Sequence, residues 1–248
     1  MRRIVGGNWK MNGTARSTEA FMAAMTAAGS TDQRADVVVF PPFTLMHLAS
    51  SKAPAWVEIG GQDIFWEPKG AYTGEISAAM LLDAGAAWFL AGHSERRHVL
   101  GETDAVVRRK LEAGLAAGLK GILCVGELLG EREAGRTETV VRGQVESGLS
   151  GLHATPENLV IAYEPVWAIG TGLTATPGEA GRMHSLIRGW VEGIAGEAFA
   201  SSLRIQYGGS VSPSNACELM STPSVDGALV GGASLDPGSF MAIVGSAG

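Results

Sequence analysis

Short apolar runs alternate with longer amphipathic segments along the whole chain. Each short run is rich in β-forming residues, and its length is typical of a strand buried on both faces. The predicted strands are residues 3–7, 37–40, 58–62, 88–91, 121–125, 159–163, 204–207 and 227–230. The longer segments carry Ala, Glu and Arg at helical spacing and predict helices, among them 17–28, 103–117, 137–149, 177–198 and 213–220.

Eight strand-then-helix units follow one another without a linker, a low-complexity tract or a break in composition. Thr176-Pro177 and Asp236-Pro237 are typical helix starts, with a capping side chain followed by proline in the first turn. The pattern predicts an α/β fold of one closed (β/α)8 barrel, for which 248 residues is an ordinary length. We therefore expect a single domain over residues 1–248, with an open doubly wound sheet as the alternative.

Composition excludes several classes of function. The net charge is −6 and there is no block of Lys or Arg, which argues against nucleic acid or an anionic membrane as the main partner. No uncharged apolar stretch reaches membrane-spanning length, and the apolar run after Arg2-Arg3 stops too soon for a signal peptide. Cys124 and Cys217 give no disulfide framework, so we expect a reducing cytoplasm.

In a barrel of this kind the chemistry lies on the loops that follow the strands. Lys10 follows the first predicted strand, His93 the fourth, Glu164 the sixth, Ser210 the seventh and Gly231-Gly232 the eighth. We expect all of these residues to meet at one rim. Trp9 and Met11 on either side of Lys10 indicate a buried flank for its ammonium group.

Glu164 ends an apolar run and is followed by a glycine-containing segment that is poor in charge, from Val166 to Ala175. This arrangement suits a general base beneath a closing lid. Because apolar neighbours remove water from a carboxylate, we expect the pKa of Glu164 to be raised.

His93 precedes Ser94-Glu95-Arg96-Arg97, which reads as the first turn of a helix. The positive end of a helix dipole disfavours imidazolium, so the pKa of His93 is expected to be lowered and the ring to be neutral. None of the five histidines stands at ligand spacing with another or with a cysteine, and we predict no metal site. Cys124, at the end of a predicted strand, is interpreted as packing rather than as a nucleophile.

Five motifs resemble those of the triosephosphate isomerase family, in order and in spacing. They are GGNWKMN from Gly6, AGHSERR from Ala91, AYEPVWAIGTG from Ala162, YGGSV from Tyr207 and DGALVGGASL from Asp226. The resemblance covers the chain from one end to the other. It implies a TIM barrel that interconverts dihydroxyacetone phosphate and D-glyceraldehyde 3-phosphate through an enediolate, in glycolysis and gluconeogenesis, without a cofactor.

The resemblance also implies roles for particular residues. Glu164 is the base, His93 polarises the carbonyl and Lys10 supplies positive charge; the family is itself a well-known example of such a base and neutral histidine. Asn8 orients Lys10, and Glu95 has a supporting role. The phosphate-binding donors are Gly170, Ser210, Gly231 and Gly232, whose amides permit close approach of an anion.

A homodimer is the implied assembly. The segment from Ile64 to Ser77 is long for a connection between strand and helix, and it carries Phe65, Trp66 and Tyr72. Apolar side chains on such a loop require a covering surface, either the chain's own barrel or a second subunit. The family uses the equivalent loop to insert into its partner.

Other interpretations remain open from the residues alone. Gly170 to Ala175 matches the dinucleotide pattern G-x-G-x-x-A, but it does not join a strand directly to a helix. A barrel aldolase that forms a Schiff base on Lys10 is one rival, and a binding protein on a retained barrel is another. Leu173 stands where the family often has lysine, which affects the expected lid motion but none of the proton-transfer residues.

Overall fold

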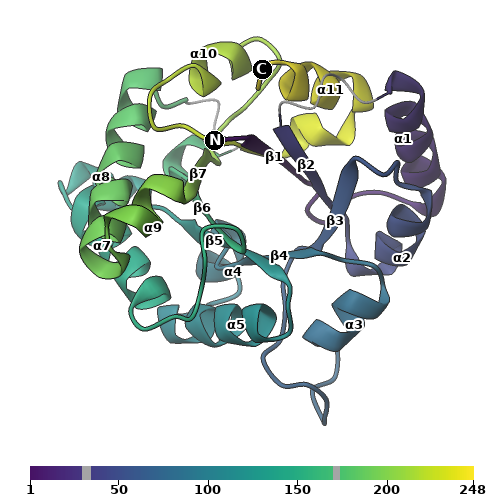
Figure 1. The fold of residues 1–248 in the computed structure, drawn as a ribbon, viewed down its shortest axis with the longest axis horizontal. Coiled ribbons are helices and arrows are strands. Elements are labelled where there is room, and N and C mark those ends of the chain that lie inside the picture. Colours follow the sequence, from purple (N-terminus) through teal and green to yellow (C-terminus); the bar gives the residue numbers. More distant parts are fainter. Residues whose placement is uncertain (30–34, 170–173) are drawn as a thin grey trace.

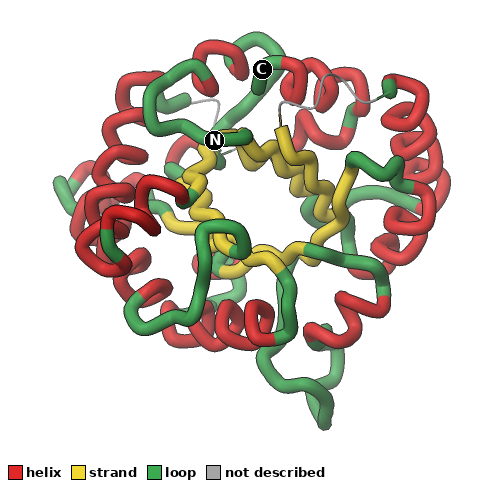
Figure 2. The backbone as a smooth tube through the Cα atoms, in the orientation of Figure 1, coloured by secondary structure: helices red, strands yellow, loops and turns green. Residues whose placement is uncertain are grey.

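The structure is a computed structural model that describes residues 1–29, 35–169 and 174–248. Its strands are β1 Arg3–Asn8, β2 Ala35–Phe40, β3 Val57–Gly61, β4 Trp88–Ala91, β5 Lys120–Val125, β6 Leu159–Tyr163, β7 Arg204–Tyr207 and β8 Gly227–Val230. They form a closed parallel barrel in which each strand pairs with the next and β8 pairs with β1 (Figures 1 and 2). The predicted (β/α)8 barrel is confirmed, and closure excludes the open doubly wound sheet.

Helices form a ring around the barrel (Figure 2). They are α1 Ala15–Ala28, α2 Phe43–Lys52, α3 Ala78–Asp83, α4 Ser94–His98, α5 Asp104–Ala116, α6 Leu129–Glu133, α7 Thr137–Leu149, α8 Pro177–Ala195, α9 Glu197–Ser202, α10 Ala216–Met220 and α11 Pro237–Gly245, with 3-10 turns η1 Val166–Ala168 and η2 Gly232–Leu235. Among the described residues, no helix combines the length and apolar character needed to cross a membrane.

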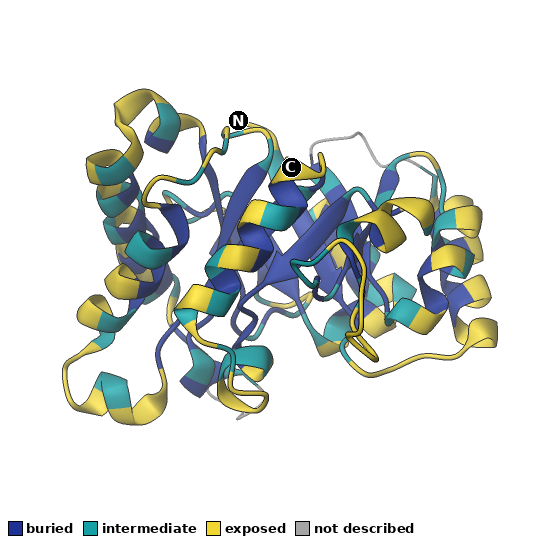
Figure 3. Ribbon diagram, turned by 90° about the horizontal axis from the view of Figure 1, so that it is seen from below, coloured by how far each residue is buried: buried dark blue, intermediate teal, exposed yellow. Residues whose placement is uncertain are grey.

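The strands are apolar throughout because both of their faces are buried (Figure 3). Alternate strand residues fill the barrel interior, including Ile4, Val38, Leu90, Ile122 and Val160. Their neighbours in the chain face outward and pack beneath the helices, including Val5, Val39, Phe89, Leu123 and Ile161. Two concentric cores therefore hold the strand ends in fixed positions.

Both predicted helix starts are present. The Thr176 side chain accepts a hydrogen bond from the Glu179 amide, and the Glu179 carboxylate accepts one from the Thr176 amide in return. The Asp236 side chain accepts from the Ser239 amide at the start of α11. These caps fix the residues at which α8 and α11 begin, after the loops that border the site.

Two predicted helices have different bounds in the structure. The predicted helix 177–198 is divided, because Gly196 has φ 86 and ends α8 before α9 begins. The predicted helix 213–220 begins only at Ala216. Before it, the amide of Ser212 donates to the side chain of Asn215 at 2.8 Å, a local bond that competes with helix formation.

Candidate active site

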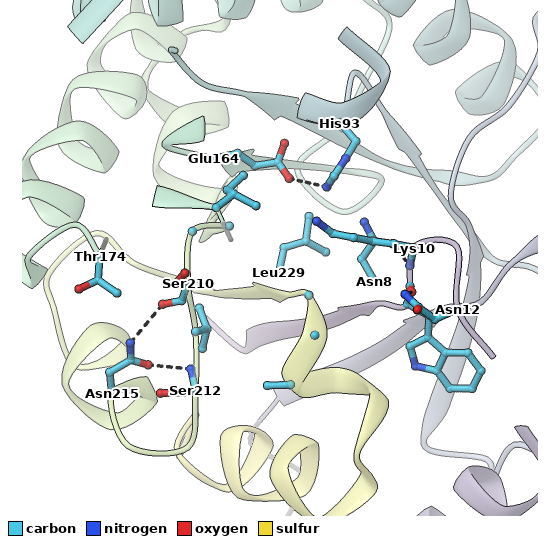
Figure 4. A pocket seen from close by; sticks show the side chains of 18 residues that line it. Asn8, Lys10, Asn12, His93, Glu164, Thr174, Ser210, Ser212, Asn215 and Leu229 are labelled. Carbon is cyan, nitrogen blue, oxygen red and sulfur yellow. Dashed lines mark hydrogen bonds and ion pairs between the residues drawn. The ribbon is translucent and has the colours of Figure 1, made fainter. Parts of the chain in front are cut away.

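A cavity of about 430 Å³ opens at the carboxyl ends of the strands (Figure 4). Seven of the residues singled out from the sequence line it: Asn8, Lys10, His93, Glu164, Ser210, Gly231 and Gly232. Gly170 lies outside the described residues, so its place in the site stays a prediction. The closed barrel thus brings the ends of β1, β4, β6, β7 and β8 to one pocket.

Glu164 and His93 are in direct contact within this pocket. Oε1 of Glu164 lies 3.0 Å from Nε2 of His93, and Oε2 accepts the Ser94 amide at 2.9 Å. Both residues are nearly inaccessible to solvent, at 2% and 5% exposed. The imidazole Nδ1 accepts from the Glu95 amide at 3.3 Å, which leaves Nε2 as the protonated nitrogen of a neutral ring.

The expected directions of both pKa values are wrong for this arrangement. Burial alone raises the pKa of Glu164, but contact with His93, the Ser94 amide and the charge of Lys10 together outweigh it, and the pKa is lowered. Burial likewise lowers the pKa of His93, but the Glu164 carboxylate outweighs it, and that pKa is raised. The expectations rested on the local surroundings of each group, whereas the contact between the two groups decides the direction of both pKa shifts.

Lys10 lies in a strained turn directly after β1. Its φ is 53, a value that a residue with a Cβ rarely adopts. The Asn8 side chain accepts the Lys10 amide at 3.0 Å, and Nζ of Lys10 lies 2.6 Å from Oε1 of Glu95. Asn8 therefore orients the main chain of Lys10, and Glu95 holds its ammonium group.

The buried flank expected around Lys10 exists on one side only. Trp9 is buried, and its indole Nε1 donates to the Ser234 carbonyl at 3.1 Å. Met11 is 96% exposed, so the expectation of burial is wrong for this residue. Two neighbours in the chain take such different positions because the turn at Lys10 directs the chain away from the barrel after Trp9.

The opposite wall of the pocket is made of small residues. The Ser210 hydroxyl donates to the Ala168 carbonyl at 2.8 Å. The Asn215 amide group donates to the Ser210 carbonyl at 3.1 Å (Figure 4). Gly231 and Gly232 lead into η2 without side chains between their backbone and the cavity. A backbone that an anion can approach closely is the usual phosphate-binding element of such barrels.

Sequence similarity to known proteins agrees with this geometry. The family model described as triosephosphate isomerase matches residues 3–247. The chain belongs to the triosephosphate isomerase family. It is 50% identical over 247 residues to a triosephosphate isomerase of Chlorobium phaeobacteroides, with 99% of both chains covered, and 51% identical over 247 residues to that of Moorella thermoacetica, with 98% of both covered.

Membership of the triosephosphate isomerase family sets aside the aldolase and the non-enzymatic binding protein as interpretations. The dinucleotide-like pattern falls largely on residues 170–173, outside the described part of the chain, as does Leu173. Within the described ranges no group of three or more His, Cys, Asp or Glu residues could hold a metal ion. Cys124 is fully buried in the barrel interior, where burial raises the pKa of its thiol well above the ordinary value.

The sequence did not indicate the part that three further residues play in this site. Gly208 lies so close to the base that a Cβ there would be 2.8 Å from Cγ of Glu164. The fully buried Glu127 accepts from the Trp167 indole at 2.8 Å and so holds the start of the predicted lid. Gln62 donates to the Lys10 carbonyl at 2.8 Å. Gly208 lies inside the YGGSV motif, but neither its closeness to Glu164 nor the contacts of Glu127 and Gln62 leave a local pattern in the sequence.

Proposed function

We propose that this chain is a triosephosphate isomerase that interconverts dihydroxyacetone phosphate and D-glyceraldehyde 3-phosphate, and that Glu164, His93 and Lys10 carry the reaction. The supporting observation is that β6, β4 and β1 place a carboxylate, an imidazole and an ammonium group around one cavity in a member of this family. The reaction needs all three kinds of group, because a carbon acid beside a carbonyl is too weak to ionise unaided.

Glu164 takes a proton from the carbon beside the carbonyl and returns it to the neighbouring carbon. His93 donates from Nε2 to the carbonyl oxygen, since Nδ1 already accepts the Glu95 amide. The ammonium group of Lys10 stabilises the negative charge that develops on the enediolate oxygen. For the substrate to enter, the Glu164 carboxylate separates from Nε2 of His93 and turns toward the substrate carbon.

The phosphate group binds at the opposite wall of the cavity. Ser210, Gly231 and Gly232 supply donors there, with Gly170 added from the predicted lid, and Asn8 and Glu95 keep Lys10 in place. Held at this end, the triose presents its two carbons to Glu164 in a fixed orientation. The translational and rotational entropy of the substrate is then lost on binding and not in the proton-transfer step. These residues account for binding and catalysis without a cofactor.

The decisive experiment compares wild type with Glu164→Gln. A coupled isomerase assay should show kcat reduced by at least about 10²- to 10⁴-fold, the usual contribution of a general base. Exchange of the substrate's carbon-bound hydrogen with D2O, followed by NMR, should be lost in parallel. Glu112→Gln, on the surface of α5, is the matched control and should retain full activity. Wild-type turnover by Glu164→Gln would show that another group is the base.

The chain acts as a homodimer through the segment from Ile64 to Ser77, which projects from the barrel between β3 and α3 (Figure 1). Inside the loop, the Phe65 ring lies 4.0 Å from Trp66 and 4.7 Å from Tyr72. Tyr72 is still 44% exposed. Further apolar side chains are exposed on α3, after β1 and after α4, namely Met11, Met80, Leu82, Val99 and Leu100. A second subunit that received the loop would cover its apolar side chains.

Sedimentation velocity at micromolar concentration tests the assembly. Wild type should sediment as a dimer, and Tyr72→Asp should shift toward monomer with reduced activity. Leu129→Asp introduces the same negative charge at another exposed apolar side chain, on α6, and should remain dimeric. A fully active wild-type monomer would remove the dimer from the proposal.

Residues 1–248 act as one catalytic domain in the cytoplasm. The pairing of β1 with β8 supports the single domain, because the two ends of the chain complete the same barrel. The free thiols of Cys124 and Cys217 suit a reducing compartment.

A further inference from the structure

The side chain of Gln62 ties together the ends of three barrel strands. Gln62 follows β3 directly and is half-buried. Its Nε2 donates to the Lys10 carbonyl at 2.8 Å and to the Phe40 carbonyl at 2.9 Å. Lys10 follows β1 and Phe40 ends β2, so one amide group fixes both neighbouring strand ends against β3.

The main chain of Lys10 depends on side chains for its conformation. With φ 53, Lys10 occupies the left-handed region, which persists in a residue other than glycine only where its surroundings enforce it. Its amide donates to Oδ1 of Asn8 at 3.0 Å, and its carbonyl accepts from Gln62. Both polar groups of this peptide segment are thus held by side-chain partners rather than by the barrel ladder.

Gln62 is itself held on a rigid base. The next residue, Asp63, is buried and accepts from Nζ of Lys110 at 2.6 and 2.8 Å, while Nη2 of Arg96 lies 2.9 Å from it. Lys110 comes from α5 and Arg96 from α4, so two helices and β3 fix the backbone beside Gln62. Preorganisation of this kind is what a supporting residue requires.

We propose that Gln62 is a positioning residue for Lys10, and that its amide donor keeps Lys10 in the left-handed conformation that aims Nζ into the active site. The inference rests on the proposed function of Lys10. Without the donor, Lys10 relaxes to a negative φ, the flanking peptide planes rotate and Nζ leaves its place beside Glu95. Attraction of the anionic substrate and stabilisation of the enediolate oxygen are then both weakened.

Gln62→Met tests the donor with little change in side-chain length. We expect KM to rise and kcat to fall, with kcat/KM reduced about 10- to 100-fold, as for other small misplacements of a catalytic group. Gln62→Glu keeps the shape of the side chain but turns an oxygen toward the two carbonyls. Its kcat/KM should therefore fall further than that of Gln62→Met. The melting temperatures of both variants should stay within a few degrees of wild type. Unchanged kinetics with a lowered melting temperature would show a structural role only and overturn the proposal.

Glu58→Gln is the matched control, because Glu58 lies in β3, the strand that Gln62 follows, with its side chain bonded to Trp88 and Lys120 and outside the residues that line the pocket. It should leave KM and kcat unchanged. All variants are assayed at concentrations where sedimentation shows the wild-type assembly. If the defect of Gln62→Met disappeared once its dimer was restored by concentration, Gln62 would act on the interface and the proposal would be wrong.

A double-mutant cycle with Lys10→Met shows whether Gln62 acts through Lys10. We expect Gln62→Met to change kcat/KM less than about 2-fold in the Lys10→Met background, since the group that it positions is already gone. A full additional loss would overturn the proposal. Loss of activity in Lys10→Met with wild-type kinetics in Gln62→Met would overturn the Gln62 role alone. Full activity in Lys10→Met would instead overturn the function proposed for Lys10, and the role of Gln62 with it.

Discussion

Nε2 of His93 lies 3.0 Å from Oε1 of Glu164, so the proposed base and the proposed electrophile are hydrogen-bonded to each other. The contact changes the protonation of both groups. It lowers the pKa of Glu164 and raises the pKa of His93, in each case against the effect of burial. Because the two groups interact so closely, they titrate together. The acid limb of a pH–rate profile therefore reports a pKa of the pair and not of Glu164 alone.

Replacing His93 should move that acid limb to higher pH. In His93→Gln the amide can still donate to a carbonyl oxygen, but the interaction that lowers the pKa of Glu164 is lost and burial raises that pKa. The base is then protonated at a higher pH than in wild type, so kcat/KM falls earlier as the pH decreases. Steady-state kinetics between pH 4 and 9 measure this. His98→Gln, at an exposed position at the end of α4, the helix that His93 precedes, should leave the acid limb in place. An acid limb at the wild-type pH in His93→Gln would contradict the coupling.

Gly208→Ala should damage catalysis while leaving the fold intact. A Cβ at this position would lie 2.8 Å from Cγ of Glu164 and 3.3 Å from the Tyr163 carbonyl, so the base must shift. We expect kcat to fall about 10- to 100-fold, since a misplaced catalytic group costs roughly that much. KM should change less. Gly178→Ala, where a Cβ would meet nothing within 4 Å, is the control. Equal kinetics in the two variants would show that Glu164 tolerates the displacement.

The barrel could be predicted from the sequence because strands that are buried on both faces appear there as short apolar runs. The structure has β4, β6, β7 and β8 at the predicted bounds, and each other strand lies within two residues of its prediction at either end. The errors lie in the helices. A glycine with positive φ at Gly196 and a side-chain turn at Asn215 changed helix ends, because local hydrogen bonds and backbone freedom there outweighed a continuous helical pattern.

The candidate site could be predicted only as far as strand ends locate it. Lys10, His93 and Glu164 each follow a strand, so the closed barrel brings them together. The support given by Gln62 and the contact between His93 and Glu164 depend on how distant strands align, which no local pattern records. For that reason residue positions were predicted well, and pKa directions were not.

Asp63 should give the folded protein a pH-dependent stability between about pH 4 and 6. Burial is the main cause that raises its pKa from 3.8 to about 6, although Lys110 and Arg96 oppose it. The folded protein therefore favours the protonated form of Asp63. The stability that this form contributes is fully present below the pKa of the unfolded chain and is lost as the pH rises through the pKa of the folded protein. The total is up to about 3 kcal/mol.

Denaturant unfolding of wild type and Asp63→Asn at constant protein concentration measures this contribution. The free energy of unfolding of wild type, relative to the variant, should be higher at pH 4.5 than at pH 7. Asp83→Asn on α3, an exposed carboxylate, should show no such difference. A wild-type advantage that instead grew with pH would mean that the pKa of Asp63 is lowered in the folded protein.

Trp167→Phe should destabilise the protein through Glu127. Glu127 is fully buried and accepts the Trp167 indole at 2.8 Å and the Tyr163 hydroxyl at 3.1 Å. Phenylalanine keeps an aromatic ring beneath Arg132 but removes the donor, so a buried carboxylate loses one of its partners. We expect the free energy of unfolding to fall by about 1–3 kcal/mol. Trp190→Phe on α8, where the indole bonds to no described residue, should cost less; equal losses would show that ring size decides the effect.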